Sequence, residues 1–578
     1  MAKRPTPAAW LSLAAGQGVT LALLIGPVAG LPWLSGFRNY FSGDQFSYAS
    51  IATNVANGDL SYVEPFTQTG ALYYPSLWYQ TLGLVSRLTG MPVPVTWTLL
   101  GVLMVCLAVL VSGIAAWRLS RLWWSPMAPA LALLTGTFAT PLIGNWSLGL
   151  GHHAALWGPF GTLFTLNAET IGLSVITIAT VIVLSLGLHG RAQGRRSTWW
   201  LACAGALIGV VANVQTYSFF TGVSFIALSV AAFGLLTSRS RRAMITTAVL
   251  LILLLVFGSA VAGVIGHIPV FGLLILAISP GLLIVAKRFP AATAAFLIPL
   301  VILSAPQVIR TALGILEGDA FLTYRQASTQ ALGVPPIGGL IASGVLIVLW
   351  LAILLVPGRD RPTWITAMLI GLGTGAVLMS SNDLWGFDQE PYRFWLQYFI
   401  VGSLLLSIIA TVEIRAYLDD EPARRRQWRP AMVVGVLAFG LYAISLADVT
   451  GFWVYARDEG IFDLTTQEST QLSEVGQQGT GLIANGPCID PQHLKLLTAA
   501  QVPYFNLGLA WPSDKAGITH VMNDLRAGEL NLEAMRVAGV SYLVTDSTCE
   551  TQWTFLPSDR VVPAAKAGPF TLWQLLPQ

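Results

Sequence analysis

Hydrophobic residues dominate this chain in long runs, and the polar residues gather in the segments between the runs. Thirteen such runs can be counted, the first from about Ala9 to Leu31 and the last from about Met432 to Ala447. A transmembrane helix needs about 20 mostly apolar residues. The pattern therefore predicts an α-helical, polytopic membrane protein with about 13 transmembrane helices.

Composition supports this class and excludes an ordinary soluble enzyme. Of the 578 residues, 54% are hydrophobic and 10% are charged, whereas soluble domains carry about 25% charged residues. Lys3 and Arg4 precede the first run, but no short apolar stretch with a small-residue cleavage site follows. We expect the first run to be an uncleaved signal-anchor helix.

Basic residues predict the orientation, because cytoplasmic turns of membrane proteins are enriched in Lys and Arg. Every second turn carries such a cluster, whereas the intervening loops are nearly free of them. The six clusters lie at residues 118–121, 191–196, 239–242, 287–288, 359–361 and 415–429. With the N-terminus in the cytoplasm, the C-terminal segment lies outside. The predicted location is a bacterial cytoplasmic membrane.

The last segment differs from the rest in charge. Residues 450–578 contain 7 Lys and Arg and 13 Asp and Glu, a net of −6, and the remainder contains 24 and 15, a net of +9. Short strand patterns (GLIAN, VPYFNLG, SYLVTD and FTLWQL) alternate with helical patterns (THVMNDLRAG and NLEAMRVAG). Alternation of this kind is typical of α/β domains. We predict a membrane domain over residues 1–449 and a small extracytoplasmic α/β domain over residues 450–578.

The four cysteines also divide between these parts. Cys106 and Cys203 lie within apolar runs and are expected to be buried. Cys488 and Cys549 lie in the acidic segment, where an oxidising compartment permits a disulfide. The alternative is a pair of free thiols.

The richest polar segment is the first outer loop, residues 36–92. Ser42 and Gln45 form a capping box, so a helix is expected from about Gly43 to Gly58, with Asp44 in its first turn. A second helix begins at Pro75 in the sequence YYPSLWY and runs to Gly90, with aromatic residues at its entrance. Such a helix suits the membrane interface.

This layout, an acid on a short helix outside the first span followed by a Tyr-Pro-x-Leu-Trp-Tyr helix, resembles the GT-C membrane glycosyltransferases. The resemblance implies an inverting glycosyltransferase that takes a monosaccharide from a polyprenyl-phosphate donor. It also implies that Asp44 is the general base, which removes the proton of the acceptor hydroxyl. The alternative is that Asp44 only caps its helix, although Ser42 already serves that purpose.

The donor phosphate requires fixed positive charge near the membrane surface, and the planar fork of arginine suits it. Arg393 and Arg325 are the candidates in late outer loops, and the GT-C resemblance agrees on this region. The alternative for Arg393 is snorkelling or pairing with Asp388 or Glu390. The candidates for other substrate contacts are His152, His153, Glu64, Gln45, Tyr324, Trp385 and Glu390.

No metal or other cofactor is expected. Some GT-C enzymes bind a divalent metal through paired acids, but Gln45 follows Asp44 here. The expected partners are the polyprenyl-phosphate-sugar donor, a glycan or lipid-linked acceptor and the bilayer, and no nucleic acid. The residue usage is similar to that of actinobacterial proteins, which would make arabinose or mannose the first sugars to test.

Two other functions fit a multispan protein. A transporter or flippase for a lipid-linked or sugar substrate usually carries charged or broken helices at mid-membrane, whereas the predicted spans are nearly free of charge. An envelope scaffold acting through its C-terminal domain would leave the polar first loop without a purpose.

Overall fold

The computed structural model describes residues 6–577 apart from several segments. Those segments are residues 27–35, 39–43, 138–161, 189–194, 328–333, 335, 356–360, 459–460, 551–552 and 554–555. The chain divides into two compact units. The first comprises Met1–Pro27, Gly101–Ile309 and Tyr324–Ala456, and the second comprises Val28–Leu100, Arg310–Thr323 and Arg457–Gln578.

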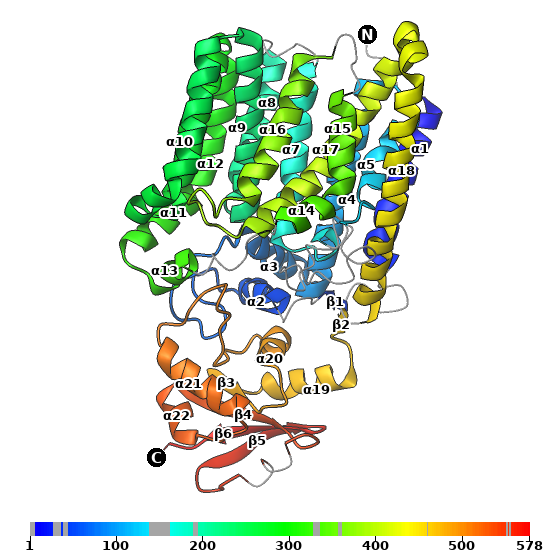
Figure 1. Ribbon diagram of the computed structural model, residues 1–578. Coiled ribbons are helices and arrows are strands. Elements are labelled where there is room, and N and C mark those ends of the chain that lie inside the picture. The colour runs from blue at the N-terminus through cyan, green and yellow to red at the C-terminus, as the bar shows by residue number, and fades with distance from the viewer. Residues whose placement is uncertain are drawn as a thin grey trace. The chain divides into compact units, whose positions relative to one another are not determined.

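The regular secondary structure in the described part of the first unit is helical (Figure 1). Its elements, some of which extend into the second unit, are α1 (Pro7–Ile25), α4 (Val93–Ser120), η2 (Ser125–Met127), α5 (Ala128–Ala132), α7 (Ala168–Leu188), α8 (Arg195–Val211), α9 (Thr216–Ser238), α10 (Arg241–Ile265), α11 (His267–Arg288), α12 (Pro290–Leu316), α13 (Ala320–Ala327), α14 (Pro336–Ala342), α15 (Gly344–Leu355), α16 (Thr363–Ser380), α17 (Pro391–Asp419) and α18 (Glu421–Asp458).

Nine helices within the described residues are long and apolar enough to cross a membrane. They are α1, α4, α7, α9, α10, α11, α12, α16 and α17. The other four predicted runs fall on α5, α8, the pair α14 and α15, and α18. The polytopic membrane class is therefore confirmed, and the total of about 13 spans stays a prediction.

Helix α17 lies at the centre of the first unit. It contacts α16, α15, α5, α7 and α9, which Figure 1 shows as neighbouring helices. Eighteen of its 29 residues are buried. In contrast, α10 and α12 leave most of their apolar side chains uncovered, among them Val256 and Ile302, which are 64% and 62% exposed. An apolar surface of this kind is expected to contact lipid.

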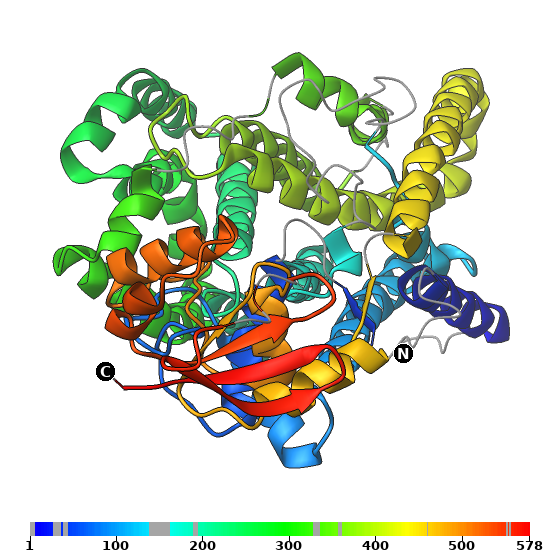
Figure 2. The ribbon, with the colours of Figure 1, turned by 90° about the horizontal axis from the view of Figure 1, so that it is seen from below.

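The second unit combines the first outer loop with the C-terminal segment. Its remaining elements are β1 (Gly36–Arg38), α2 (Asp44–Ala56), α3 (Leu77–Thr89), β2 (Ile461–Asp463), α19 (Gln467–Gly476), β3 (Leu482–Asn485), α20 (Pro491–Thr498), α21 (Lys515–Arg526), α22 (Leu532–Val537), β4 (Val540–Asp546), β5 (Val561–Ala567) and β6 (Phe570–Leu575). The sheet has the order β3-β4-β6-β5, with β3 and β4 parallel and the other neighbours antiparallel. Figure 2 shows its strands beside the short helices of the same segment.

Two contacts join the first loop to the C-terminal segment. Strand β1 pairs with β2 in antiparallel register, with Phe37 opposite Phe462. Phe66, which is fully buried, belongs to the same hydrophobic cluster as Ile483, Val544 and other residues of the α/β segment. The core of this segment is therefore completed by a side chain that lies about 400 residues earlier in the chain.

The helices of the first loop follow their sequence signals closely. The expected helix from about Gly43 to Gly58 is α2, and the helix expected to stop at Gly90 is α3, whose C-cap Gly90 has a φ of 72°. At Gly83, a side chain would collide with the carbonyl group of Ala52, so glycine lets α3 approach α2 closely.

The prediction of a strand at VPYFNLG is wrong. Residues 502–508 form an irregular loop, in which the Asn506 carbonyl accepts the N–H group of Leu509 at 3.0 Å. Pro503 cannot donate a ladder hydrogen bond, which disfavours a strand here. Strand β5 was not predicted, because Pro563 and Lys566 interrupt its apolar pattern.

Cys488 and Cys549, which the sequence analysis pairs, form a disulfide with Cα atoms 6.3 Å apart. Their sequence separation is 61 residues. Replacing both cysteines by serine is expected to lower the free energy of unfolding of the C-terminal segment by about 4 kcal/mol in the chain-entropy model. Pulse proteolysis of the full chain, read at cleavage sites within residues 461–577, measures this difference.

The matched control for the disulfide replaces Cys106 and Cys203, the two free cysteines, by serine. That variant should respond to reductant as the wild type does. The prediction would be contradicted if the C-terminal segment resisted proteolysis equally well with and without the cysteine pair.

Candidate functional site

Two clusters of polar side chains stand out, one in each unit. The first surrounds the N-terminus of α17, where Glu390 is the N-cap residue and is only 3% exposed. Arg325 Nη2 donates to Glu390 Oε1 at 2.7 Å, and Arg393 Nε donates to Glu390 Oε2. A single buried carboxylate therefore holds both arginines that the sequence analysis proposes for phosphate binding.

A second carboxylate and two neutral side chains extend this cluster. Glu169 of α7 lies 3.5 Å from Arg393 Nη1 and accepts a hydrogen bond from Gln397 Nε2 at 2.8 Å. Tyr217 accepts a hydrogen bond from Arg325 Nη2 at 3.1 Å, and the Arg393 guanidinium lies 5.3 Å from the centre of its ring. The sequence reasoning missed Glu169 and Tyr217, although a carboxylate at the start of an apolar run was a visible signal.

The charges of this cluster balance. Arg325 and Arg393 contribute two positive charges, and Glu390 and Glu169 contribute two negative charges. Burial alone would raise the pKa of Glu390, but the guanidinium groups of Arg393 and Arg325 outweigh burial and lower this pKa to about 2. Glu390 is thus charged at neutral pH, and the pairing alternative for Arg393 is observed with Glu390 and Glu169 as the partners.

The backbone around Glu390 is held in an unfavourable conformation. Asp388 and Glu390 have φ values of 48° and 34°, which cost non-glycine residues of the order of 1–3 kcal/mol each. The Asn382 side chain stabilises this turn. Its Oδ1 accepts the N–H group of Gln389 at 2.6 Å, and its Nδ2 donates to the carbonyl groups of Met379 and Gln389.

The second cluster surrounds Asp44 at the start of α2. Asp44 is partly exposed, whereas ten of the 13 residues of α2 are buried. Asp44 Oδ1 accepts a hydrogen bond from Asn506 Nδ2 at 3.0 Å, and the same nitrogen donates to Ser47 Oγ at 3.2 Å. The sequence analysis missed Asn506, because 462 residues separate it from Asp44 and it lies in the segment predicted as a strand.

Other candidate residues lie away from these clusters. Trp385 is fully buried, donates to the Leu378 carbonyl at 2.7 Å and stacks on Phe387, so its surroundings are those of a core residue. Gln45 is 3% exposed, and its Oε1 accepts no hydrogen bond from the described residues. Tyr324 is 37% exposed on α13. His152 and His153 lie outside the described residues.

Glu64 lies inside a turn of the first loop. Its carboxylate accepts the N–H groups of Phe66 and Thr67, both at 2.8 Å, and the hydroxyl of Thr67 at 2.7 Å. Glu64 therefore holds the backbone that presents Phe66 to the core of the second unit. Burial raises its pKa to about 7, against the opposing effect of these hydrogen bonds and of the buried Lys495.

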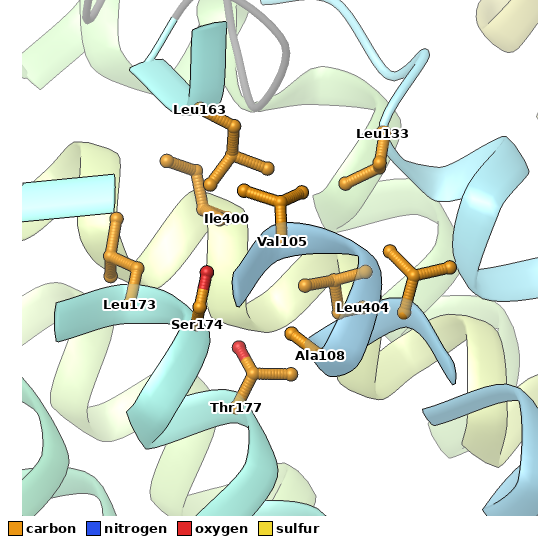
Figure 3. A pocket seen from close by; sticks show the side chains of 10 residues that line it. Val105, Ala108, Leu133, Leu163, Leu173, Ser174, Thr177, Ile400 and Leu404 are labelled. Atoms are coloured by element: carbon orange, nitrogen blue, oxygen red, sulfur yellow. The ribbon is translucent and has the colours of Figure 1, made fainter. Parts of the chain in front are cut away.

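A small cavity of the first unit lies among α4, α7 and α17 (Figure 3). Its lining is apolar except for the hydroxyl groups of Ser174 and Thr177. Without a charged group it does not suit a phosphate. No three His, Cys, Asp or Glu side chains of the described residues are grouped so that they could hold a metal ion, and metal independence stays a prediction.

Comparison with known proteins supports the fold. No protein-family profile and no curated protein matches the chain. Among solved structures, the mycobacterial arabinofuranosyltransferase AftD (mutant R1389S) matches all of this chain and 42% of its own length, with 15% identity and a TM-score of 0.51. The chain thus spans under half of that protein. At this identity the likeness shows a shared fold, and the predicted GT-C-like fold is confirmed.

Two other structures show weaker similarity. The oligosaccharyltransferase AglB from Archaeoglobus fulgidus, in complex with an inhibitory peptide and a dolichol-phosphate, has 12% identity and a TM-score of 0.49 over 94% of this chain and 70% of that one. ArnT from Cupriavidus metallidurans, bound to undecaprenyl phosphate, has 14% identity and a TM-score of 0.43. The match covers 99% of this chain and 100% of that one.

The raised pKa of Glu64 predicts a pH-dependent stability of the second unit. The folded state binds the proton more tightly than the unfolded state, whose pKa is 4.5. The stabilising contribution is complete below pH 4.5 and is lost as the pH rises to about 7, by about 3 kcal/mol in total. Thermal unfolding and pulse proteolysis between pH 4.5 and pH 7 measure this loss.

The comparison variant for this prediction is Glu64→Gln, which cannot titrate. His493, whose pKa burial lowers to about 4, changes stability in the opposite direction over part of the same range, and the difference between wild type and variant cancels it. A wild-type stability that stays parallel to that of Glu64→Gln would contradict the prediction.

Proposed function

We propose that the protein is an inverting membrane glycosyltransferase that moves a monosaccharide from a polyprenyl-phosphate donor to an extracytoplasmic glycan, glycolipid or glycoprotein. The observation that carries the proposal is the partly exposed Asp44 at the start of α2, in a chain with a GT-C-like fold. The fold by itself does not assign a reaction, so the proposal depends on the chemistry of the two clusters.

Asp44 is proposed as the general base. As the acceptor hydroxyl oxygen attacks the anomeric carbon, the carboxylate takes the hydroxyl proton. A bond forms between that oxygen and the anomeric carbon, and the bond from the anomeric carbon to the phosphate oxygen breaks. The phosphate leaves with the electron pair on the opposite side, so the configuration at the anomeric carbon inverts.

Arg325 and Arg393 are proposed to bind the phosphate of the donor. Arg325 lies in the last turn of α13 and Arg393 lies in the first turn of α17. The Arg325 side chain is 29% exposed. Each guanidinium carries five donor N–H groups in a planar fork, a geometry that suits a phosphate. The developing charge on the leaving phosphate is best stabilised by donors that are fixed before the reaction begins, and Glu390 and Glu169 supply that fixation.

The first test replaces Asp44 by asparagine, which keeps the shape of the side chain and can still cap the helix. Loss of a general base commonly costs about 10²–10⁴-fold in rate. We expect Asp44→Asn to lose transfer to that extent with an unchanged melting temperature. The assay uses synthetic decaprenyl-phosphate arabinofuranose or mannose with a soluble oligosaccharide acceptor.

The matched control for Asp44→Asn is Asp59→Asn, the same substitution in the same loop, at a side chain that bonds the exposed Ser61. It should retain transfer. Wild-type turnover by Asp44→Asn would contradict the assignment of the base, and movement of the lipid across vesicles without sugar transfer would favour a flippase.

The second test concerns donor binding. Arg325→Ala removes a charge-assisted hydrogen-bond donor, and such bonds contribute about 1.5–3 kcal/mol. We expect the affinity for decaprenyl phosphate to fall by about tenfold or more, as measured by lipid-dependent thermal shift in detergent. The affinity for the acceptor should stay unchanged.

Arg361→Ala is the control for this loss. Arg361 pairs with Glu413 at 3.0 Å in a similarly buried ion pair. Arg361 precedes α16 and Glu390 follows it, and a helix of 18 residues is about 27 Å long. Both variants lose an ion pair of the first unit, and only Arg325→Ala should lose lipid binding. Equal lipid affinity in the two variants would remove Arg325 from the phosphate site.

A further inference from the structure

The C-terminal segment contributes a side chain to the environment of Asp44. The Asn506 amide makes three hydrogen bonds in its immediate surroundings. Its Nδ2 donates to Asp44 Oδ1 at 3.0 Å and to Ser47 Oγ at 3.2 Å, and its Oδ1 accepts the N–H group of Gly508 at 2.8 Å. Since a backbone N–H group can only donate, the Oδ1 atom must face Gly508, and the amide N–H groups must face α2.

We propose that Asn506 is the positioning residue of Asp44, and that the C-terminal segment is therefore part of the catalytic machinery. This inference rests on the proposed function of Asp44 as the general base. The oxygen of a general base must lie within about 2.6–3.2 Å of the hydroxyl oxygen whose proton it removes. A hydrogen bond from a rigid amide restricts the carboxylate to one orientation and stabilises its charged form without adding a countercharge.

The loop that carries Asn506 is anchored on both sides. Before it, the Val502 N–H group donates to the Phe66 carbonyl at 3.0 Å, and Gln501 Nε2 donates to Gln68 Oε1 at 2.6 Å. After it, the Ser513 N–H group donates to Thr69 Oγ1 at 3.1 Å. All three anchors reach the turn of the first loop that Glu64 stabilises. Asn506 is thus held against the same loop that supplies Asp44.

The titratable side chains around α2 leave a pH range in which the protonation of Asp44 can be followed. The titratable side chains of the helices packed against it are Tyr79 and Arg87 of α3 and His493 and Lys495 of α20. Tyr504, near Asn506, interacts electrostatically with Asp44. Burial lowers the pKa of His493 to about 4 and that of Lys495 to about 8, so His493 is mostly neutral and Lys495 is mostly charged between about pH 5 and pH 6.5. Glu64 begins to titrate there but is the same in every variant.

The experiment measures the protonation of Asp44 directly in the full chain. A water-soluble carbodiimide modifies protonated carboxyl groups, and peptide mass spectrometry reads the extent of modification at Asp44 as a function of pH. In Asn506→Ala the half-modification pH should rise by about half a unit or more, because one hydrogen bond to the charged form is lost. In Asn506→Asp it should rise further, since a like charge then faces Asp44.

Transfer activity provides the second measurement. Misplacement of a catalytic group can cost about 100-fold, so Asn506→Ala should lower kcat by about 10–100-fold with little change in the donor KM. The acid limb of its pH–rate profile should move in the same direction as the modification curve. Asn506→Asp is nearly isosteric and keeps the acceptor for Gly508, so it tests the proposal even where alanine disturbs the loop.

The matched control is Asn531→Ala, another asparagine of the C-terminal segment. Its Oδ1 caps α22 by accepting the N–H group of Ala534 at 3.0 Å. This variant should lose stability while keeping the wild-type modification curve and pH–rate profile. Unchanged curves in both Asn506 variants would overturn the positioning role. Normal transfer by Asp44→Asn would instead overturn the base itself, so the two failures are distinguishable.

Discussion

The burial of α2 is the constraint on which the second unit depends. A 13-residue helix with ten buried residues, several of them polar, needs cover that satisfies both its apolar and its polar groups. Helix α3 covers one part, and α20 of the C-terminal segment covers another. One of the buried polar side chains of α2, that of Asn54, donates a hydrogen bond to the Pro65 carbonyl at 2.9 Å. The first loop and the C-terminal segment consequently form one compact unit.

The same requirement explains the surroundings of Glu64 and Phe66. Phe66 can enter the core of the α/β segment only if its own backbone N–H group is satisfied, and Glu64 accepts that group. The carboxylate is buried as a result, and its proton affinity increases. Glu64 is thus explained by the packing of the loop and does not require a substrate contact.

In the first unit, charged side chains of opposite sign pair with one another at the N-terminus of α17. An uncompensated buried charge is costly, and the four charged groups of this cluster, Arg393 included, offset one another. Asn382 holds the strained turn that places Glu390 between the two arginines. In each unit an asparagine outside any recognisable motif fixes the geometry of the charged groups: Asn382 beside Glu390, and Asn506 beside Asp44.

Much of the architecture could be predicted from local patterns. Long apolar runs specify membrane helices because an isolated span must satisfy its own backbone hydrogen bonds. Glycine and proline signals specified the ends of α2 and α3, and continuous apolar patterns specified β3, β4 and β6. Asp44 could be selected from its place in the first outer loop and the GT-C resemblance, and Arg325 and Arg393 as arginines in late outer loops.

Tertiary structure alone decided which of these residues meet. The pairing of β1 with β2 involves three residues on each strand, too few for a period-2 pattern. Glu169 reaches Arg393, and Asn506 reaches Asp44, across more than 200 and 400 residues of chain. No local propensity encodes such contacts, because they arise when distant segments bury a shared surface and must then satisfy its polar groups.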